Sequence, residues 1–370
     1  LENEKNTVGN RIGSYVTNMD FSQGIKANLN APFRIIYSRE ARKKIRAVLD
    51  DFQPDVVHLN NIQYHLTPSI ILEINKWRKE TKKECKIVYT THDYQLVCPS
   101  HGMFDVNMRP CELCLDGHYI HCFQTKCLKN SRAKSLLGTL DGYMWKYSKA
   151  YSYVDAYICC SFFLKSKLDT QKRFRDKTIG LHNFKKEMPH LDNIQKKGYV
   201  LEFGHLSRDK GTDTLLEVAK KMPNTEFVFI GYGPSVDKMK DIPNVKYLGF
   251  KTGEELYRII AEAAISVCPS EWYENCPYSV MESVLLGTPV VGSKMGGIPE
   301  LIEPGKTGEL FEAGNVEDLM KAIKKVLQTQ DVLERYTKNC SQVNYETTES
   351  YYVKLMKIYR GEKNVEQISS

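Results

Sequence analysis

The sequence predicts an α/β fold made of two doubly wound, parallel-sheet domains. Apolar, β-branched runs alternate with helical stretches along most of the chain, which is typical of parallel strands joined by crossover helices. The 370 residues, of which 42% are hydrophobic, are enough for two α/β domains. Polar, glycine-containing loops follow four strands of the second half, as in sheets that bind ligands beyond their carboxyl ends.

Composition narrows the class of protein. The net charge of +7 fits a solvated surface first, contact with anionic phosphates or lipid second and nucleic acid last, so we expect no nucleic-acid partner. No window has the roughly 18 to 20 apolar residues of a membrane-spanning helix, and the polar residues 1–15 do not resemble a signal peptide. We therefore expect the eleven cysteines to be reduced and the protein to be cytoplasmic.

Residues 1–182 are expected to form the first domain. Its predicted helices cover about 37–52, 67–80, 133–153 and 162–169, and its predicted strands cover 55–59, 86–90, 156–159 and 178–181. Residues 98–127 form an irregular, cysteine-rich insertion between these elements. The polar segment 183–198, with a proline and several lysines, is expected to be the linker to the next domain.

Residues 199–343 are expected to form the second domain, with a cleaner alternation of elements. Its predicted strands cover 199–203, 226–230, 245–248, 264–268 and 289–292, and its predicted helices lie near 211–221, 253–262, 278–286, 298–303 and 316–328. The tail, residues 344–370, contains a helix over about 344–360 with apolar residues on one face. We expect this helix to pack back on the first domain.

Four loops after strands of the second half carry the residues that suit a phosphate and polyol ligand. They cover 204–211, 231–234, 269–277 and 293–300, and are rich in Gly, Lys and Glu. Because ligands collect beyond the carboxyl ends of parallel strands, we expect Gly204, Gly231 and Gly233 to line a ligand site.

The loop before residue 278 predicts an anion site at a helix start. Pro277 suits the beginning of a helix and Gly287 its end. The first-turn N–H groups of Tyr278, Ser279 and Val280 would then be free to bind a diphosphate, helped by the helix dipole. Two carboxylates flank this start and can accept hydroxyl hydrogen bonds, namely Glu274 and Glu282. The alternative is that both are surface acids near a helix N-terminus, where acids are favourable anyway.

These residues resemble a known signature. The segment PSEWYENCPYSVMES at 269–283, followed by GTPVV at 287–291, resembles the E-x7-E motif of the retaining glycosyltransferases of family 4. The likeness continues through GGIPELI at 296–302 and GKTG at 305–308, and covers about residues 56–315. The resemblance implies a GT-B fold, in which two Rossmann-like domains face each other across a cleft. The first domain would serve the acceptor and the second would bind a nucleotide-sugar donor.

The resemblance also assigns roles to individual donor-side residues. It implies that Glu274 contacts the donor sugar, Glu282 the ribose hydroxyls, and the amides of 278–280 the diphosphate. Lys210 matches the lysine that pairs with the donor phosphates, and a departing nucleoside diphosphate requires a cation. The alternative for Lys210 is an exposed lysine at a helix start. The family usually has Arg where this chain has His205, and Arg208 is the candidate to compensate.

In the first half, His92 follows a predicted strand directly. It resembles the family histidine that approaches the transferred sugar from the opposite domain, so we assign it to catalysis together with Glu274 and Lys210. The alternative is an ordinary histidine of the core or surface. Asn183 resembles an asparagine of a short family motif, with a role in the hinge as the alternative.

The start of the chain departs from the family pattern. Family members begin with a strand, a Gly-Gly loop and a helix on the acceptor side, and no segment here matches them. We therefore expect the first βαβ unit, of the order of 30 residues, to be missing from the N-terminus.

Four cysteines in the insertion have spacings compatible with a structural zinc ion. Cys111 and Cys114 form a C-x2-C pair, and Cys122 and Cys127 form a looser C-x4-C pair. A segment with so little apolar core would gain stability from a metal. Free or buried thiols are the alternative, followed by disulfides or another metal. None of these cysteines is expected to take part in catalysis.

The function implied is transfer of a hexose from a UDP- or GDP-sugar to a saccharide or lipid-linked acceptor, with retention of configuration, as in bacterial surface polysaccharide synthesis. No Asp-x-Asp metal motif is present, and Lys210 with a helix dipole can replace a divalent cation, so no metal or other cofactor is expected for catalysis.

Two other classes of function compete with this one. A nucleotide-sugar-binding module without turnover is the alternative. An NAD-dependent oxidoreductase is disfavoured because no Gly-x-Gly-x-x-Gly follows a first strand. The cationic residues of 165–177 predict either peripheral contact with anionic lipid at the inner face of the cell membrane or a plain solvated face.

Overall fold

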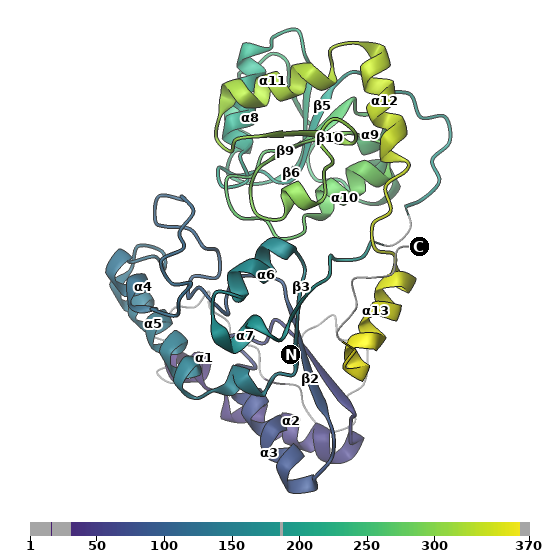
Figure 1. Cartoon of the computed structure of the whole chain (residues 1–370). Coiled ribbons are helices and arrows are strands. Elements are labelled where there is room, and N and C mark those ends of the chain that lie inside the picture. Colours follow the sequence, from purple (N-terminus) through teal and green to yellow (C-terminus); the bar gives the residue numbers. More distant parts are fainter. Residues whose placement is uncertain (1–15, 17–30, 186–187, 363–370) are drawn as a thin grey trace.

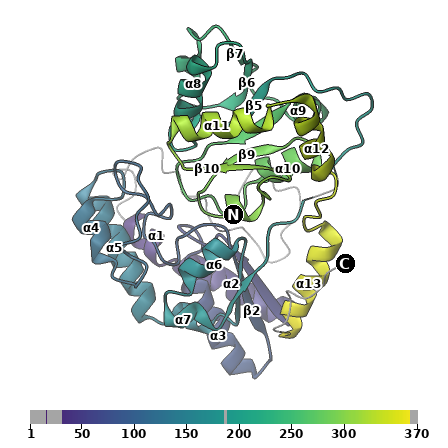
Figure 2. The ribbon, with the colours of Figure 1, turned by 45° about the horizontal axis from the view of Figure 1, so that its top comes forward.

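Two α/β domains, each built around a parallel β-sheet, make up the computed structural model, which describes residue 16, residues 31–185 and residues 188–362 (Figure 1). The predicted fold class is confirmed. Figure 2 shows the same two domains from a second direction, with α6 of the first domain facing the second domain. None of the helices that the structure describes is both long and apolar enough to cross a membrane.

The first sheet is all-parallel and keeps the order of the chain. Among the described residues its strands are β1 (Val56–Asn60), β2 (Lys86–Thr91), β3 (Ala156–Cys159) and β4 (Thr178–Gly180), hydrogen-bonded in that order. All residues of β2 after its first are buried. This continuous burial is expected of a parallel strand that is covered on both faces.

Serine residues begin three helices of this domain. The hydroxyl oxygens of Ser38, Ser131 and Ser161 each accept a hydrogen bond from the backbone N–H three residues later, which satisfies one donor of the first turn. The described helices are α1 (Ala31–Ile36), α2 (Arg39–Phe52), α3 (Ser69–Thr81), α4 (Ile120–Thr125), α5 (Arg132–Tyr147), α6 (Phe162–Leu168) and α7 (Lys172–Arg175), with a 3-10 turn η2 (Ala150–Tyr153).

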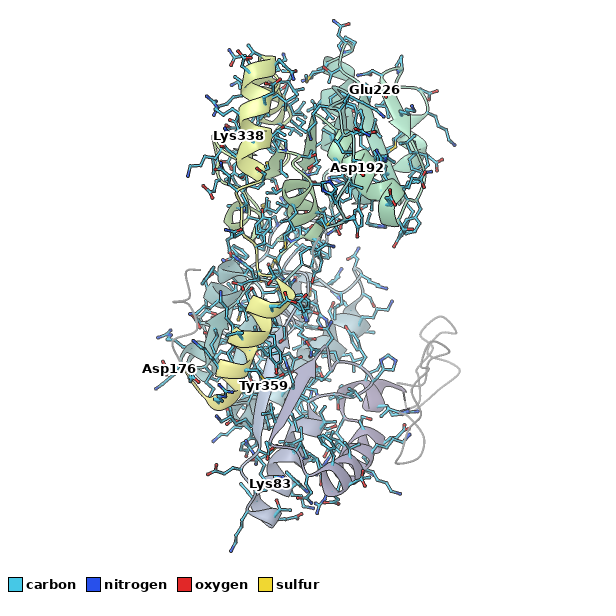
Figure 3. The ribbon with its side chains drawn as sticks, turned by 90° about the vertical axis from the view of Figure 1, so that its right-hand side faces the viewer. Lys83, Asp176, Asp192, Glu226, Lys338 and Tyr359 are labelled. Carbon is cyan, nitrogen blue, oxygen red and sulfur yellow. The ribbon has the colours of Figure 1, made fainter. Side chains whose placement is uncertain are left out.

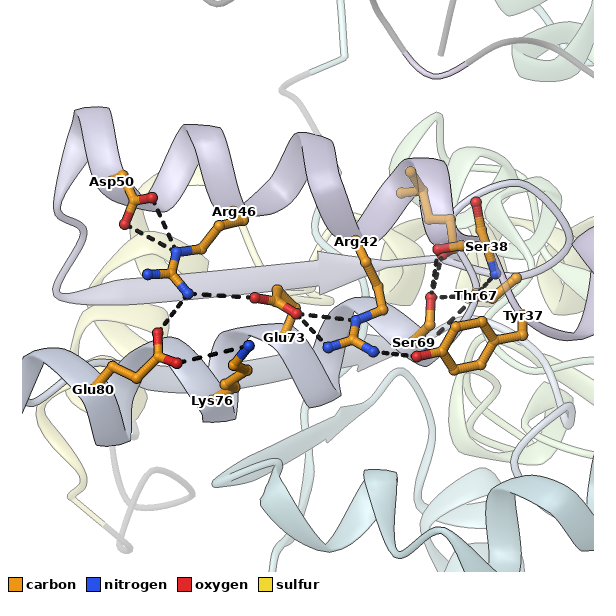
Figure 4. A network of polar contacts seen from close by, with 11 residues as sticks. Tyr37, Ser38, Arg42, Arg46, Asp50, Thr67, Ser69, Glu73, Lys76 and Glu80 are labelled. Atoms are coloured by element: carbon orange, nitrogen blue, oxygen red, sulfur yellow. Dashed lines mark hydrogen bonds and ion pairs between the residues drawn. The ribbon is translucent and has the colours of Figure 1, made fainter.

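An ionic network centred on Glu73 joins α2 to α3 (Figure 4). Glu73 is buried on α3 and accepts a hydrogen bond from Arg42 Nε at 3.0 Å, while Arg46 Nη1 lies 3.5 Å from its other oxygen. Arg46 also pairs with the exposed Glu80 at 2.6 Å. Two cations thus offset the desolvation of one buried carboxylate.

The second sheet reverses its order in the middle. Its described strands are β5 (Val200–His205), β6 (Phe227–Tyr232), β7 (Val245–Tyr247), β8 (Ile265–Cys268), β9 (Val290–Ser293) and β10 (Gly308–Phe311). They lie in the order β10-β9-β8-β5-β6-β7, all parallel. The first and fourth strands of the domain, β5 and β8, are therefore neighbours. This is the topological switch point at which doubly wound sheets bind ligands.

The helices of the second domain lie on both faces of this sheet. They are α8 (Thr212–Lys221), α9 (Gly253–Glu262), α10 (Tyr278–Leu285), α11 (Val316–Val326) and α12 (Gln330–Cys340), with the 3-10 turns η3 (Val236–Met239) and η4 (Ile298–Glu300). Helices α8 and α11 pack on one face with Phe227 and Phe229, and α9 packs on the other with Val228 and Ile230.

The chain crosses between the domains twice. After α12 it returns to the first domain, where α13 (Thr348–Arg360) covers the sheet with Ile358 against Val88 and Ile158. Figure 3 shows this return, with Lys338 on α12 beside the second domain and Tyr359 on α13 against the first. The two crossing segments are joined by a backbone hydrogen bond from Lys185 N to Glu346 O at 2.9 Å.

Several elements differ from the sequence prediction for local reasons. The helix predicted at 133–153 is divided into α5 and η2, because Lys149 between them has a left-handed backbone with φ 56°. The helix predicted at 298–303 is only the short turn η4, since Pro304 disfavours helical backbone at the residue before it. Helix α4 lies within the insertion that was predicted to be irregular. Strand β10 and helix α12 were not predicted.

The Glu73 network generates a stability prediction. Glu73→Ala leaves Arg42 and Arg46 facing a helix interface without their shared carboxylate, so we expect the free energy of unfolding to fall by about 2 kcal/mol. Denaturant unfolding measures this change. Glu80→Ala removes an exposed partner of Arg46 and serves as the control, with an expected loss much smaller than that of Glu73→Ala. Equal losses in the two variants would contradict the prediction.

Candidate functional site

A cation and a carboxylate meet at the switch point of the second sheet. Lys210, in the loop after β5, lies with its Nζ 2.6 Å from Glu274 Oε1 in the loop after β8. The same carboxylate oxygen accepts a hydrogen bond from Ser270 Oγ at 3.1 Å, and the Lys210 ammonium lies 4.3 Å from the centre of the Trp272 ring. Both side chains are mostly buried. The structure thus brings together two residues that the sequence analysis assigned to one site.

Backbone contacts hold the loop of Glu274 in place. Glu271 N donates to Asp209 O at 2.9 Å, which ties the loops after β5 and β8 together. On the other side Gly297 N donates to Glu274 O at 2.7 Å. Gly296 has φ 61°, and a Cβ atom there would lie 2.0 Å from Glu274 O. Only glycine fits this position, so the GG pair serves the placement of Glu274.

The amino end of α10 lies beside this pair, with Pro277 as its N-cap. The amides of Tyr278 and Ser279 have no hydrogen-bond partner in the part of the chain that the structure describes. The third predicted amide is different, because Val280 N donates to Pro277 O at 3.2 Å in a local turn. The expectation of three free amides is therefore corrected to two.

Cys268 forms part of the floor of the site and was missed by the sequence analysis. It ends β8, and its thiol hydrogen-bonds Ser279 of α10. Burial raises its pKa to about 12, with the charge of Glu274 adding to the rise. The thiol is therefore uncharged near neutral pH. A cysteine at the end of an apolar strand gives no sequence signal of this position.

Glu282 faces a linker lysine. The carboxylate of Glu282 in α10 forms a close ion pair with Lys185 Nζ, and both side chains are mostly buried. The Lys185 ammonium also lies 5.4 Å from the centre of the Tyr278 ring. Sequence reasoning missed Lys185, because the linker contains several lysines and nothing in the sequence distinguishes this one.

The remaining predicted donor residues lie at the ends of β5 and β6. Gly204 and Gly231 are register partners, and a Cβ atom on Gly231 would lie 1.8 Å from Gly204 O. Gly233 follows β6 directly. His205 is exposed and its ring meets Tyr232 edge-on at 5.4 Å.

Arg208 is also exposed. Burial raises the pKa of the Asp213 carboxyl, but its polar and cationic neighbours, one of which is Arg208, lower it below the usual value. Neither His205 nor Arg208 forms a hydrogen bond or ion pair with Lys210 or Glu274 within the described residues.

His92 lies on the first domain where that domain meets the Glu274 loop. Its Nε2 is 3.2 Å from Asn60 Oδ1, so the carboxyl ends of β1 and β2 contribute neighbouring polar groups. Its backbone oxygen accepts a hydrogen bond from Asn275 Nδ2 at 2.8 Å, across the domain boundary. Burial lowers the His92 pKa, which favours the neutral ring. His92 is therefore in direct contact with Asn275, the residue that follows Glu274.

The cysteine-rich insertion borders the same loop. Glu112 accepts a hydrogen bond from Tyr273 OH at 2.9 Å and pairs with Lys167 Nζ at 2.6 Å. Phe104 packs near Trp272, with ring centroids 6.1 Å apart. Two adjacent aromatic residues of the Glu274 loop thus contact a segment that the sequence analysis left without a role in the site.

A carboxylate of the second domain holds a helix of the first. Glu300, in η4, accepts hydrogen bonds from the backbone N–H groups of Phe162 and Phe163 at 2.8 and 2.6 Å, at the start of α6. It also lies 2.7 Å from His182 Nε2. Negative charge is favourable at a helix N-terminus, so this contact stabilises the observed arrangement of the domains.

The prediction of a structural zinc ion is not supported by the arrangement of the residues. Cys111, Cys114, Cys122 and Cys127 border one small cavity, but no group of three or more His, Cys, Asp or Glu among the described residues is placed to hold a metal ion. All four are free thiols. Cys114 and Cys122 pack with Tyr119 as apolar groups, and burial raises the Cys114 pKa to about 12. The structure agrees with the alternative of buried thiols.

The basic stretch of 165–177 is largely occupied within the fold. Lys165 pairs with Asp169 at 2.7 Å, and Lys167 pairs with Glu112. Lys177 donates to two backbone oxygens at 2.7 Å each. These contacts occupy much of the charge that the stretch was expected to offer to anionic lipid, and lipid contact there stays a prediction beside the alternative of a solvated face.

Comparison with known proteins finds relatives of the second domain. Residues 183–343 match the family described as "Glycosyl transferases group 1". Over 146 residues the chain is 33% identical to sulfoquinovosyl transferase SQD2 of Arabidopsis thaliana. The aligned residues cover 38% of this chain and 28% of that protein. It is 30% identical over 166 residues to the amylovoran biosynthesis glycosyltransferase AmsK of Erwinia amylovora, covering 40% and 41%. The chain thus spans well under two thirds of both relatives.

The structural comparison covers both domains. The crystal structure of Anabaena Alr3699/HepE in complex with UDP superposes with a TM-score of 0.62 over 86% of this chain and 82% of that one, at 15% identity. The fold is therefore of the GT-B type. The match to the glycosyl transferases group 1 covers the second domain together with the linker before it.

The floor of the site gives a pH-dependent stability prediction. Glu202 on β5 is fully buried, accepts a hydrogen bond from Thr212 Oγ1 at 2.7 Å, and its Oε2 has no partner among the described residues. Burial raises its pKa from 4.5 to about 8. Between these values the folded protein holds a proton that the unfolded chain releases. The free energy of unfolding should therefore fall with rising pH, by about 1.4 kcal/mol per unit from this group.

Glu202→Gln should remove this dependence. We expect the variant to gain stability relative to the wild type from pH 5 to pH 8.5, roughly along the slope set by the shifted carboxyl. Thermal unfolding at several pH values measures the difference. Glu217→Gln on the exposed face of α8 is the control. Parallel pH profiles for the wild type and Glu202→Gln would show that Glu202 is already ionised in the fold.

The Glu300 contact gives a prediction about domain arrangement. Glu300→Ala leaves two amides of α6 and His182 without their acceptor, so we expect a loss of about 1–2 kcal/mol in unfolding free energy. We also expect a larger radius of gyration by X-ray scattering. Glu303→Ala, which removes an exposed carboxylate paired with Lys306, is the control. An unchanged radius in Glu300→Ala would mean that other contacts alone hold the domains together.

Proposed function

We propose that this protein is a retaining glycosyltransferase that transfers a hexose from a nucleoside-diphosphate sugar to a saccharide or lipid-linked acceptor in bacterial surface polysaccharide synthesis. The observation that carries the proposal is the Lys210–Glu274 pair at the switch point, 2.6 Å apart beside the start of α10. It lies in a domain of the glycosyl transferases group 1. The complex of the structural neighbour HepE with UDP supports a uridine nucleotide as donor.

The donor diphosphate would bind at the start of α10. The amides of Tyr278 and Ser279 belong to the first turn and have no acceptor among the described residues, and the helix dipole favours an anion there. The Lys210 ammonium supplies the full positive charge. A diphosphate competes with Glu274 for this ammonium, so donor binding would release the Glu274 carboxylate to accept hydroxyl hydrogen bonds from the sugar.

Glu282 would accept hydrogen bonds from the ribose hydroxyls. Its second oxygen remains available when one oxygen is held by Lys185, and this ion pair fixes the direction of the carboxylate. Binding the nucleotide through Glu282 and the sugar through Glu274 would place the bond to be broken between them, near Lys210.

The transfer would proceed by front-side attack. The acceptor hydroxyl oxygen forms a bond to the anomeric carbon as the bond from that carbon to the diphosphate oxygen breaks on the same face. The acceptor proton passes to a phosphate oxygen of the leaving group. Lys210 and the α10 amides stabilise the negative charge that develops on the diphosphate, so this scheme needs no divalent metal. His92, held by Asn60, would contact the sugar from the first domain.

Kinetics and nucleotide binding test the proposal together. A UDP and GDP panel should raise the melting temperature, since a site filled at about 100 times its dissociation constant adds about 2.7 kcal/mol. Glu282→Ala should abolish this shift. Glu274→Gln should keep it and lower kcat with the matching labelled sugar donor about 10²- to 10³-fold, because it removes an interaction with the reacting sugar.

Glu303→Ala, an exposed carboxylate of the same domain, is the matched control and should leave both readouts unchanged. A nucleotide shift without turnover by the wild type would favour the alternative of a nucleotide-sugar-binding module. A shift that survives in Glu282→Ala would place the nucleotide elsewhere and overturn the site.

A further inference from the structure

Helix α5 buries one face and exposes large apolar side chains on another. Ser135, Thr139 and Trp145 are buried against the domain. On the other side, four large apolar residues follow one another at spacings of four, four and three, which places them in one stripe along the helix. They are Leu136, Leu140, Met144 and Tyr147, with exposed fractions of 44%, 52%, 36% and 73%.

The stripe continues onto α4. Ile120, at the start of α4, is 39% exposed, and its backbone N–H donates to Tyr143 OH at 3.3 Å. Tyr143 in turn stacks on Tyr147, with ring centroids 5.9 Å apart. We call these five exposed residues, Ile120 and the four of α5, the α5 stripe. Contiguous apolar surface of this kind marks a site of interaction, whereas single exposed apolar residues do not.

The segment that carries most of the stripe is rich in positive charge. Residues 126–149 contain six lysines and arginines and a single acidic residue, Asp141. None of the six cations forms an ion pair within the described residues. Lys146 donates to Gly117 O at 2.9 Å, and the other five are Lys126, Lys129, Arg132, Lys134 and Lys149. Asp141 does not balance them at the surface. It is mostly buried, hydrogen-bonds the Trp145 indole N–H at 2.9 Å, and burial raises its pKa to about 7.

This combination selects one partner. A protein partner matched to the stripe would have to supply acidic groups around an apolar centre, whereas an anionic bilayer offers both over any area. We propose that the α5 stripe docks on an anionic lipid bilayer. Its leucines, isoleucine and methionine enter the boundary between head groups and acyl chains, Tyr147 stays at the head-group level, and the flanking cations face lipid phosphates.

The docking surface is connected to the candidate site through the insertion. Thr139 of α5 donates to Tyr119 O at 3.1 Å, and Tyr119 lies in the segment that carries Glu112 and Phe104. Those two residues contact the Glu274 loop. A bilayer held at α5 would therefore lie on the first domain, from which a lipid-linked acceptor of the proposed reaction would enter. The docking itself does not depend on sugar transfer.

Vesicle co-sedimentation tests the proposal. We expect the wild-type chain to bind vesicles with about one third phosphatidylglycerol in phosphatidylcholine, and to bind pure phosphatidylcholine vesicles much more weakly. The double variant Leu136→Ser/Leu140→Ser should reduce the partition coefficient at least about tenfold. Phe250→Ser, at an aromatic residue of the second domain that is even more exposed than the two leucines, is the control and should bind like the wild type.

A charge variant makes the test independent of the apolar substitutions. Lys129→Gln/Arg132→Gln should weaken binding to the anionic vesicles at least about fivefold and should leave the melting temperature unchanged. Equal binding of the wild type to neutral and anionic vesicles, or equal losses in Phe250→Ser, would overturn the proposal. A third result would also overturn it: the wild type is a dimer, Leu136→Ser/Leu140→Ser is a monomer, and vesicles bind neither protein. The stripe would then be an interface between two copies of the chain.

Discussion

The reversal of strand order between β5 and β8 is the constraint on which the candidate site depends. In a parallel sheet all strands end at one edge, and successive crossover connections normally lie side by side there. At this junction the connections after β5 and β8 leave on opposite faces, so their first residues diverge around a crevice. Lys210 comes from one of these loops and Glu274 from the other. Helix α10 follows the second loop, so its free amides point to the same place.

The crevice keeps its shape through main-chain contacts as well as side chains. The loop after β8 is bonded on one side to Asp209 and on the other to Gly297. At Gly296 the approach of two backbones leaves no room for a side chain. The position of the Glu274 carboxylate is therefore fixed by three segments that are distant in sequence. The charges of the site can face one another at short range because the backbone holds them there.

The fold class could be predicted from the sequence because its causes are local. Buried parallel strands must be continuous apolar runs, and the turns between them need glycine or proline, so both leave visible patterns. The grouping of Lys210 with Glu274 followed from the rule for strand ends. Lys185 could not be predicted, because its contact with Glu282 depends on where the linker passes α10.

The same limit applies to the cysteine and lysine patterns of the first domain. Cysteine spacing does not distinguish metal ligands from thiols that pack as apolar groups, which is what Cys114 and Cys122 do. Cationic residues that lie near one another in the sequence predict a basic surface patch. Only tertiary contacts show that Lys165, Lys167 and Lys177 are bound to carboxylates and carbonyls of their own domain.

The hydrogen bond between Lys185 N and Glu346 O has a mechanical consequence. It ties together the two segments that cross between the domains, so a relative motion of the domains has to move both segments together or break this bond. Lys185 belongs to the first of these segments, and its side chain reaches Glu282 in the second domain. A displacement of the paired segments would therefore also displace the cation that holds a carboxylate in the donor half.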